Sequence, residues 1–90
     1  MVVIERAVPI VNSLGLHARP AAEFVKTAGR FKASVQVCKD ELAVNGKSIM
    51  GMMMLAAECG SRLTIRVEGE DAEVAIETLA ALIAAGFGED

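Results

Sequence analysis

The only histidine of the chain, His17, lies in the segment 16–20, which reads Leu-His-Ala-Arg-Pro. A break that contains Gly15 precedes this segment, and an apolar stretch with helical periodicity follows it. The first N–H groups of a helix have no partner within the helix and carry partial positive charge, so a helix start can bind an anion. We therefore expect His17 to be exposed beside a site for a negatively charged group.

Arg19 adds a permanent cation two residues after His17, and its planar guanidinium suits phosphate oxygens. A neutral imidazole is a competent nucleophile near neutral pH. A phosphoryl group on an imidazole nitrogen stays labile, so it can be passed on through a loose transition state. Together these features favour a site that accepts and releases a phosphoryl group. The same residues also fit an ordinary surface histidine or a helix cap, and their spacing alone does not decide between the two interpretations.

Alternating and helical apolar patterns predict the elements that position this segment. The predicted strands are residues 3–11, 34–39, 42–45 and 62–68, and the predicted helices are residues 18–29, 49–56 and 72–85. Arg6 and Pro9 favour an edge position for the first strand, because Pro9 lacks a ladder donor. Gly29 predicts a left-handed helix end, and Ser48 and Asp71 are candidate N-caps.

All three predicted helices need an apolar partner, and strands and helices alternate along most of the chain. The simplest arrangement is one mostly antiparallel four-stranded sheet with the helices on one face, which is an α+β fold. A chain of 90 residues is too short for two domains, so residues 1–90 form one.

Composition excludes several classes of function. The formal net charge of −3 argues against nucleic acid, which requires a basic face for its phosphates. The longest apolar runs, residues 49–57 and 79–87, are far shorter than the roughly 20 residues of a membrane-spanning helix. No signal peptide is visible, which predicts a cytoplasmic protein. Cys38 and Cys59 form no CxxC pair, and with a single histidine they predict reduced, partly buried thiols and no metal site.

Two motifs resemble those of a known family. Residues 15–21 (Gly-Leu-His-Ala-Arg-Pro-Ala) resemble the active-site signature of the histidine-containing phosphocarrier family, HPr. Residues 47–51 (Lys-Ser-Ile-Met-Gly) resemble its regulatory serine motif, at the matching separation. The resemblance covers nearly the whole chain, and it implies an open-faced β-sandwich, with a four-stranded antiparallel sheet covered on one face by three helices.

The resemblance also implies roles for the site residues. His17 would accept the phosphoryl group through Nδ1, with the Arg19 side chain and the backbone N–H groups of Ala18 and Arg19 beside the phosphate. Enzyme I, charged by phosphoenolpyruvate, would be the donor, and a IIA component of the phosphotransferase system would be the acceptor. Such a chain is a stoichiometric carrier rather than a turnover enzyme, needs no cofactor, and is expected to be a monomer.

Ser48 has two compatible interpretations. It fits a helix N-cap, and by the resemblance it is a regulatory site for an HPr kinase/phosphorylase. A phosphate there would add negative charge beside the docking surface and weaken docking of enzyme I without unfolding the domain. Residues 12–15 and the tail 86–90 resemble the nitrogen-related branch of the family, so the choice between sugar transport and a regulatory relay stays open. Leu14 departs from relatives with Ser or Asn at that position, since it cannot donate a hydrogen bond to phosphate.

The segment 49–56 is rich in methionine, and its methionines cannot all face the core of a short helix. Met52 and Leu55 are expected in the core, whereas exposed methionine provides adaptable contact surface for more than one partner. The predicted docking surface for enzyme I and IIA components comprises Leu16, Ala22, Lys47, Ile49, Met50 and Met53. The acidic tail, Glu89 and Asp90, is expected to be solvated and frayed.

Two other functions fit parts of the pattern. A small hydrolase of the acylphosphatase type also places an arginine and backbone N–H groups around phosphate, but the segment 16–20 is placed wrongly for the arginine loop of that family. A purely regulatory binding module acting through Ser48 would transfer no phosphate. The presence of His17 together with Arg19 argues against this second alternative.

Overall fold

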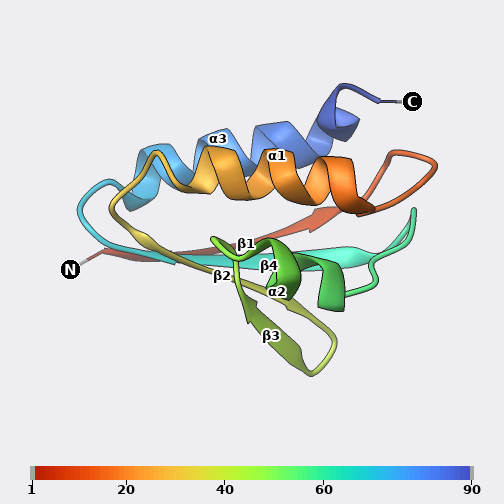
Figure 1. Ribbon diagram of the computed structural model, residues 1–90. Helices are drawn as coiled ribbons and strands as arrows, with labels where there is room; N and C mark the ends of the chain where they lie inside the picture. Colours follow the sequence, from red (N-terminus) through yellow and green to blue (C-terminus); the bar gives the residue numbers. More distant parts are fainter. Residues whose placement is uncertain (1, 90) are drawn as a thin grey trace.

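Four strands form one antiparallel sheet in the computed structural model, which describes residues 2–89 (Figure 1). They are β1 (Val3–Pro9), β2 (Ser34–Lys39), β3 (Leu42–Asn45) and β4 (Arg62–Glu68), in the order β1-β4-β2-β3. The predicted edge position of the first strand is confirmed. Pro9 is the last residue of β1, where its missing N–H costs the ladder little.

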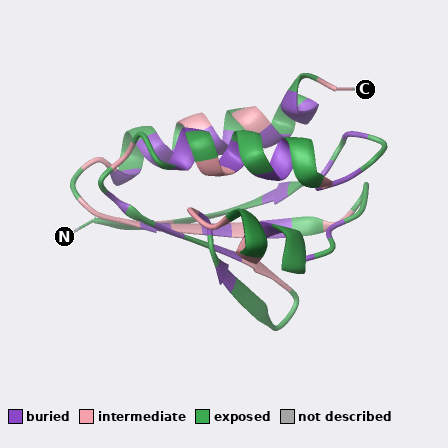
Figure 2. Ribbon diagram, in the orientation of Figure 1, coloured by how far each residue is buried: buried purple, intermediate pink, exposed green. Residues whose placement is uncertain are grey.

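The helices are α1 (Ala18–Ala28), α2 (Ile49–Met54) and α3 (Ala72–Ala84), followed by the single turn η1 (Gly86–Gly88). The two long helices α1 and α3 lie side by side over one face of the sheet, while the short helix α2 lies beside β3 (Figure 1). Their outer faces are exposed and their inner faces buried (Figure 2). The predicted open-faced α+β sandwich is confirmed. Within residues 2–89 no helix combines the length and apolarity needed to cross a membrane.

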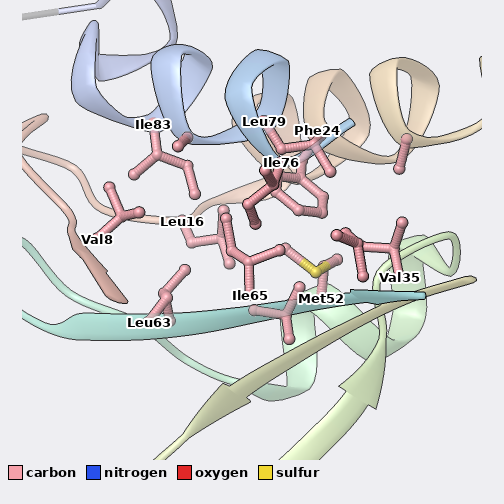
Figure 3. Close-up of a cluster of buried hydrophobic side chains, with 14 of the residues drawn as sticks. Val8, Leu16, Phe24, Val35, Met52, Leu63, Ile65, Ile76, Leu79 and Ile83 are labelled. Carbon is pink, nitrogen blue, oxygen red and sulfur yellow. The ribbon is translucent and has the colours of Figure 1, made fainter. Parts of the chain in front are cut away.

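The core lies between the sheet and the two long helices (Figure 3). In β4, Leu63, Ile65 and Val67 are fully buried, as their strict alternation with polar residues predicts. Above them α3 contributes Ala72, Ile76, Leu79 and Ile83, which recur every three or four residues. Full burial of one such Leu or Ile side chain stabilises the fold by about 1.5–3 kcal/mol.

Helix α1 is fixed on this core by small residues around one large ring. Ala21 and Ala28 are fully buried, so the helix approaches its neighbours closely, and the Phe24 ring between them is also fully buried. Met52 of α2 and Leu55 just beyond it are buried too, as predicted. The first turn of α1 is therefore held by the packing of the rest of the helix.

Two helix ends differ from the sequence prediction. Gly29 has φ −65°, so α1 ends in right-handed geometry and the left-handed stop predicted there is wrong. Helix α2 stops at Met54 instead of reaching residue 56, because Ala56 adopts φ +48°. After α3, Gly86 ends the helix as its position in the sequence predicts, with a left-handed φ of +66°.

Asp71 occupies the N-cap position of α3 as predicted, but its side chain makes no capping hydrogen bond. Its carboxylate instead accepts the backbone N–H groups of Lys32 and Ala33, each at 2.8 Å, and so ties the start of α3 to the segment before β2. The hydrogen bond from Lys32 is the largest cause that lowers the pKa of Asp71, and it outweighs the desolvation that raises it.

Asp71→Asn is expected to remove this pH-dependent stability. A carboxyl whose pKa is lowered on folding stabilises the native state above its ordinary value of about 3.8, and this contribution is lost as the pH falls through the lowered native pKa. The urea midpoint of the wild type should exceed that of Asp71→Asn at neutral pH, and the gap should shrink below about pH 4. Asp40→Asn, which removes the same charge from an exposed turn, is the control. A gap that stays constant with pH would show that Asp71 makes no such contribution.

Candidate functional site

His17 is the N-cap residue of α1, in extended backbone geometry, with 36% of its side chain exposed. Its ring makes no capping hydrogen bond to the backbone of the helix. The carbonyl of His17 accepts the N–H of Ala21 at 3.0 Å and closes the first helical turn. Pro20 has no N–H, so the open donors of this turn belong to Ala18 and Arg19, which are both exposed. The structure thus brings together the four groups predicted to bind phosphate.

The loop before His17 is fixed by a close approach of two backbone segments. Gly15 has φ +69°, and a Cβ atom there would lie 2.5 Å from the carbonyl oxygen of Ala57. The same carbonyl accepts the N–H of Leu16 at 2.8 Å. Leu16 is consequently turned into the core and is only 5% exposed. The prediction that Leu16 contributes to an exposed docking surface is wrong, because the turn at Gly15 directs its side chain inward.

The carboxylate of Glu89 contacts one nitrogen of the histidine ring. Both Glu89 oxygens are 3.0 Å from Nε2 of His17, and Oε2 also accepts a hydrogen bond from Nη1 of Arg19 at 3.0 Å. Asn12 donates from Nδ2 to Oε1 of Glu89 at 3.0 Å and to the carbonyl of Gly15 at 2.8 Å. One carboxylate therefore joins the tail to the histidine, the arginine and the loop that precedes them.

The tail reaches this position through a tight reversal after α3. Gly86, Phe87 and Gly88 all have positive φ, and the N–H of Glu89 bonds to the carbonyl of Gly86 at 2.8 Å. The Phe87 ring is buried in the core, which fixes the turn. Only 13% of the Glu89 side chain is exposed, so the predicted solvated, frayed tail is wrong for this residue. Asp90 lies outside the described residues.

Sequence reasoning missed both Asn12 and Glu89 as site residues. Asn12 is fully buried, although it was expected to be part of a chain break. The one sequence signal that could have located Glu89 is Phe87, because an apolar residue between two glycines indicates a chain that folds back onto a core.

The electrostatic consequence of these contacts falls on Glu89. The hydrogen bond from His17 is the largest cause that lowers its pKa, with further contributions from Asn12 and Arg19, against a desolvation that raises it. Glu89 is thus held as a carboxylate, which can only accept hydrogen bonds.

The second motif lies at the start of α2, where Ser48 is the N-cap as predicted. Its Oγ accepts the N–H of Gly51 at 3.0 Å. Ile49, Met50 and Met53 are 46%, 74% and 44% exposed, as expected for a docking surface, and Ala22 on α1 is exposed as well. The ammonium group of Lys47, by contrast, donates a hydrogen bond to the carbonyl of Phe31 at 2.7 Å. Its position is thus explained by a contact within the fold.

A shallow hollow of about 430 Å³ lies beside the ring of His17. Leu14, which is 74% exposed, and Cys59 contribute to its lining. Cys38 and Cys59 are both free thiols, and Cys59 is exposed, so the prediction of partial burial holds only for Cys38. No group of acidic, cysteine and histidine side chains within residues 2–89 is arranged to bind a metal ion.

The comparisons with known proteins agree with this geometry. A family model described as the PTS HPr component phosphorylation site matches residues 4–85. The chain is 45% identical over 86 residues to the phosphocarrier protein HPr of Neisseria meningitidis, covering 96% of this chain and 97% of that protein. The solved structure of HPr from Thermoanaerobacter tengcongensis has a TM-score of 0.92 and 47% sequence identity, covering 97% of this chain and 98% of that chain. The structure of an HPr dimer from the same organism has a TM-score of 0.77 and 49% sequence identity, covering 91% of this chain and 94% of that chain.

Gly15→Ala is expected to destabilise the loop that positions His17. The substitution adds a Cβ atom into the space occupied by the Ala57 carbonyl, in addition to the strain of a positive φ. Gly60→Ala is the matched control, because Gly60 has φ +93° but a Cβ atom added there would meet no atom within 4 Å. We expect the control to lose about 1–3 kcal/mol of unfolding free energy from strain, and Gly15→Ala to lose about 1–3 kcal/mol more from the clash. Equal losses in urea unfolding would contradict the close approach at Gly15.

Proposed function

Because this chain belongs to the HPr family of phosphocarrier proteins, we propose that it accepts a phosphoryl group on His17 from enzyme I and passes it to a IIA component of the phosphotransferase system. The observation that supports the proposal most directly is the half-exposed ring of His17 at the start of α1, next to Arg19. A buried ring could not meet two different protein partners.

The proposed transfer is an in-line displacement at phosphorus. Nδ1 of His17 forms the new N–P bond while the bond to the donor breaks, and the electron pair of that bond stays with the donor. The charge on the three equatorial oxygens is stabilised by the guanidinium of Arg19 and by the open N–H groups of Ala18 and Arg19. The two backbone N–H groups are fixed before the phosphoryl group arrives, because α1 is packed on the core through Ala21 and Phe24.

We further propose that the exposed apolar side chains of α2, namely Ile49, Met50 and Met53, dock enzyme I and IIA components in turn, together with Ala22. Methionine side chains are flexible and polarisable, so one surface can fit several partners. A carrier must also release each partner quickly, which a small apolar surface permits.

Regulation through Ser48 is the remaining part of the proposal. An HPr kinase/phosphorylase would attach phosphate to Ser48, adding nearly two negative charges beside Ile49 and Met50. The group would lie at the positive end of α2, where it does not oppose the helix. Its proposed effect is therefore weaker docking of enzyme I with an intact fold.

Labelling by phosphoenolpyruvate and enzyme I tests the main proposal. The wild type should take up about one phosphoryl group per chain, in a linkage that is labile in acid and stable in alkali, and His17→Ala should take up none. Arg19→Ala should accept the group about 100-fold more slowly, as for loss of one transition-state donor. His17 makes no capping bond, so His17→Ala should keep the fold, which circular dichroism checks. Label that persists in His17→Ala would overturn the proposal, and an unlabelled wild type would favour a purely regulatory module acting through Ser48.

Met50→Glu tests the docking surface. A charge placed on the most exposed methionine of α2 should raise the KM for enzyme I about tenfold, which corresponds to about 1.4 kcal/mol, while kcat changes little. Val74→Glu is the matched control, because Val74 is 61% exposed on α3, outside the proposed docking surface. An equal effect of the two substitutions would rule out a specific role for Met50.

Ser48→Asp and Ser48→Ala separate the two roles of Ser48. Ser48→Ala removes the hydrogen bond to Gly51 and should cost about 1 kcal/mol of unfolding free energy without slowing phosphoryl transfer. Ser48→Asp retains a capping oxygen and should slow transfer from enzyme I while stability is kept. Transfer at the wild-type rate in Ser48→Asp would argue against control by charge at this position.

A further inference from the structure

The tail carboxylate contacts the ring nitrogen that is not the proposed nucleophile. Both oxygens of Glu89 lie 3.0 Å from Nε2 of His17, which leaves the opposite edge of the ring, with Nδ1, for the phosphoryl group. On the basis of the function proposed above, we propose that Glu89 is a positioning residue for phosphoryl transfer. Its carboxylate holds the proton on Nε2, so that Nδ1 accepts and returns the phosphoryl group without any proton transfer.

The choice of tautomer follows from hydrogen-bond chemistry. A neutral imidazole carries one N–H, and an ionised carboxylate can only accept. A carboxylate at Nε2 therefore favours the tautomer with the proton on Nε2 and a free lone pair on Nδ1, as carboxylates that accept from one ring nitrogen of other functional histidines do. The lowered pKa of Glu89, caused mainly by its hydrogen bond with His17, keeps the carboxylate in the required form.

The carboxylate is held firmly enough to orient the ring. Asn12 fixes Oε1 from a fully buried position, and its amide is itself bonded to the carbonyl of Gly15. Phe87 fixes the turn that carries Glu89. Ring, loop and tail are therefore cross-linked by hydrogen bonds between residues 72 and 77 positions apart in sequence.

The proton balance of the transfer explains how a carboxylate at Nε2 would assist it. When Nδ1 bonds to phosphorus and Nε2 keeps its proton, the ring becomes a cation. The carboxylate of Glu89 compensates that charge at the opposite nitrogen. In onward transfer the N–P bond breaks, its electron pair returns to Nδ1, and the ring leaves as the same neutral tautomer. Neither step needs a proton donor or acceptor from the partner protein.

The other ionisable groups near the ring are compatible with a positioning role for Glu89. Arg19 bonds to Glu89 through Nη1 alone, so its remaining N–H donors can meet phosphate oxygens. Glu58 and Cys59 line the hollow that His17 also lines. The competing interpretation is that Glu89 occupies the anion site and must be displaced, which predicts the opposite effect of removing its charge.

The test uses the full chain with Glu89→Gln, and Glu73→Gln as the matched control. Glu73 is exposed in the first turn of α3, at the end of the helix remote from the tail, so it loses the same charge away from the site (Figure 1). The ring tautomer is read from ¹⁵N NMR of the unphosphorylated chain, in the alkaline range where the ring ¹⁵N shifts no longer change with pH. The rate of acceptance is read in a single turnover with phosphorylated enzyme I.

Glu89→Gln is expected to lower the population of the Nε2–H tautomer and to slow acceptance about tenfold or more, with little change in the KM for enzyme I. Glu73→Gln should match the wild type in both measurements. An unchanged tautomer, an unchanged rate or faster acceptance in Glu89→Gln would overturn the proposal. A wild type that shows the Nε2–H tautomer but takes up no phosphoryl group would instead overturn the proposed function, and the two failures are therefore distinguishable.

Discussion

The start of α1 is the constraint on which the rest of the site depends. A helix must leave its first N–H groups without partners, and Pro20 removes one of them, so the open donors lie next to His17. A positive φ at Gly15 turns the chain so that Leu16 enters the core while His17 stays at the surface. Burial of Ala21 and Phe24 then prevents the helix from shifting. The proposed anion site is thus a consequence of backbone geometry that the core holds in place.

A carrier must keep its reactive ring exposed and yet hold it in one orientation. Packing cannot supply that orientation, because a packed ring would be hidden from partners. We propose that a short tail supplies it here, since Phe87 is buried and Glu89 reaches back to Nε2 of the ring. The hydrogen bonds from Asn12 and Arg19 limit the motion of the carboxylate. The ring of His17 can therefore stay exposed and still be held in one orientation, without being packed into the core.

Local features of the sequence predicted most of the fold and the centre of the site. The alternation in β4 and the period of α3 are properties of short segments, and so are the N-cap at Ser48 and the break before His17. What could not be predicted depends on contacts between distant segments. Leu16 turns inward because of the carbonyl of Ala57, and Asp71 bonds to residues that lie before β2. Glu89 meets a ring 72 positions earlier, and the local pattern around Phe87 indicates a chain that folds back but not which residue it meets.

The most direct test of the account is ³¹P and ¹⁵N NMR of the ¹⁵N-labelled chain after phosphorylation by enzyme I and phosphoenolpyruvate. The one-bond coupling between phosphorus and nitrogen identifies the atom that carries the phosphoryl group. Phosphorus is expected on Nδ1 of His17, with a proton retained on Nε2. Phosphorus on Nε2, or on any residue other than His17, would contradict it.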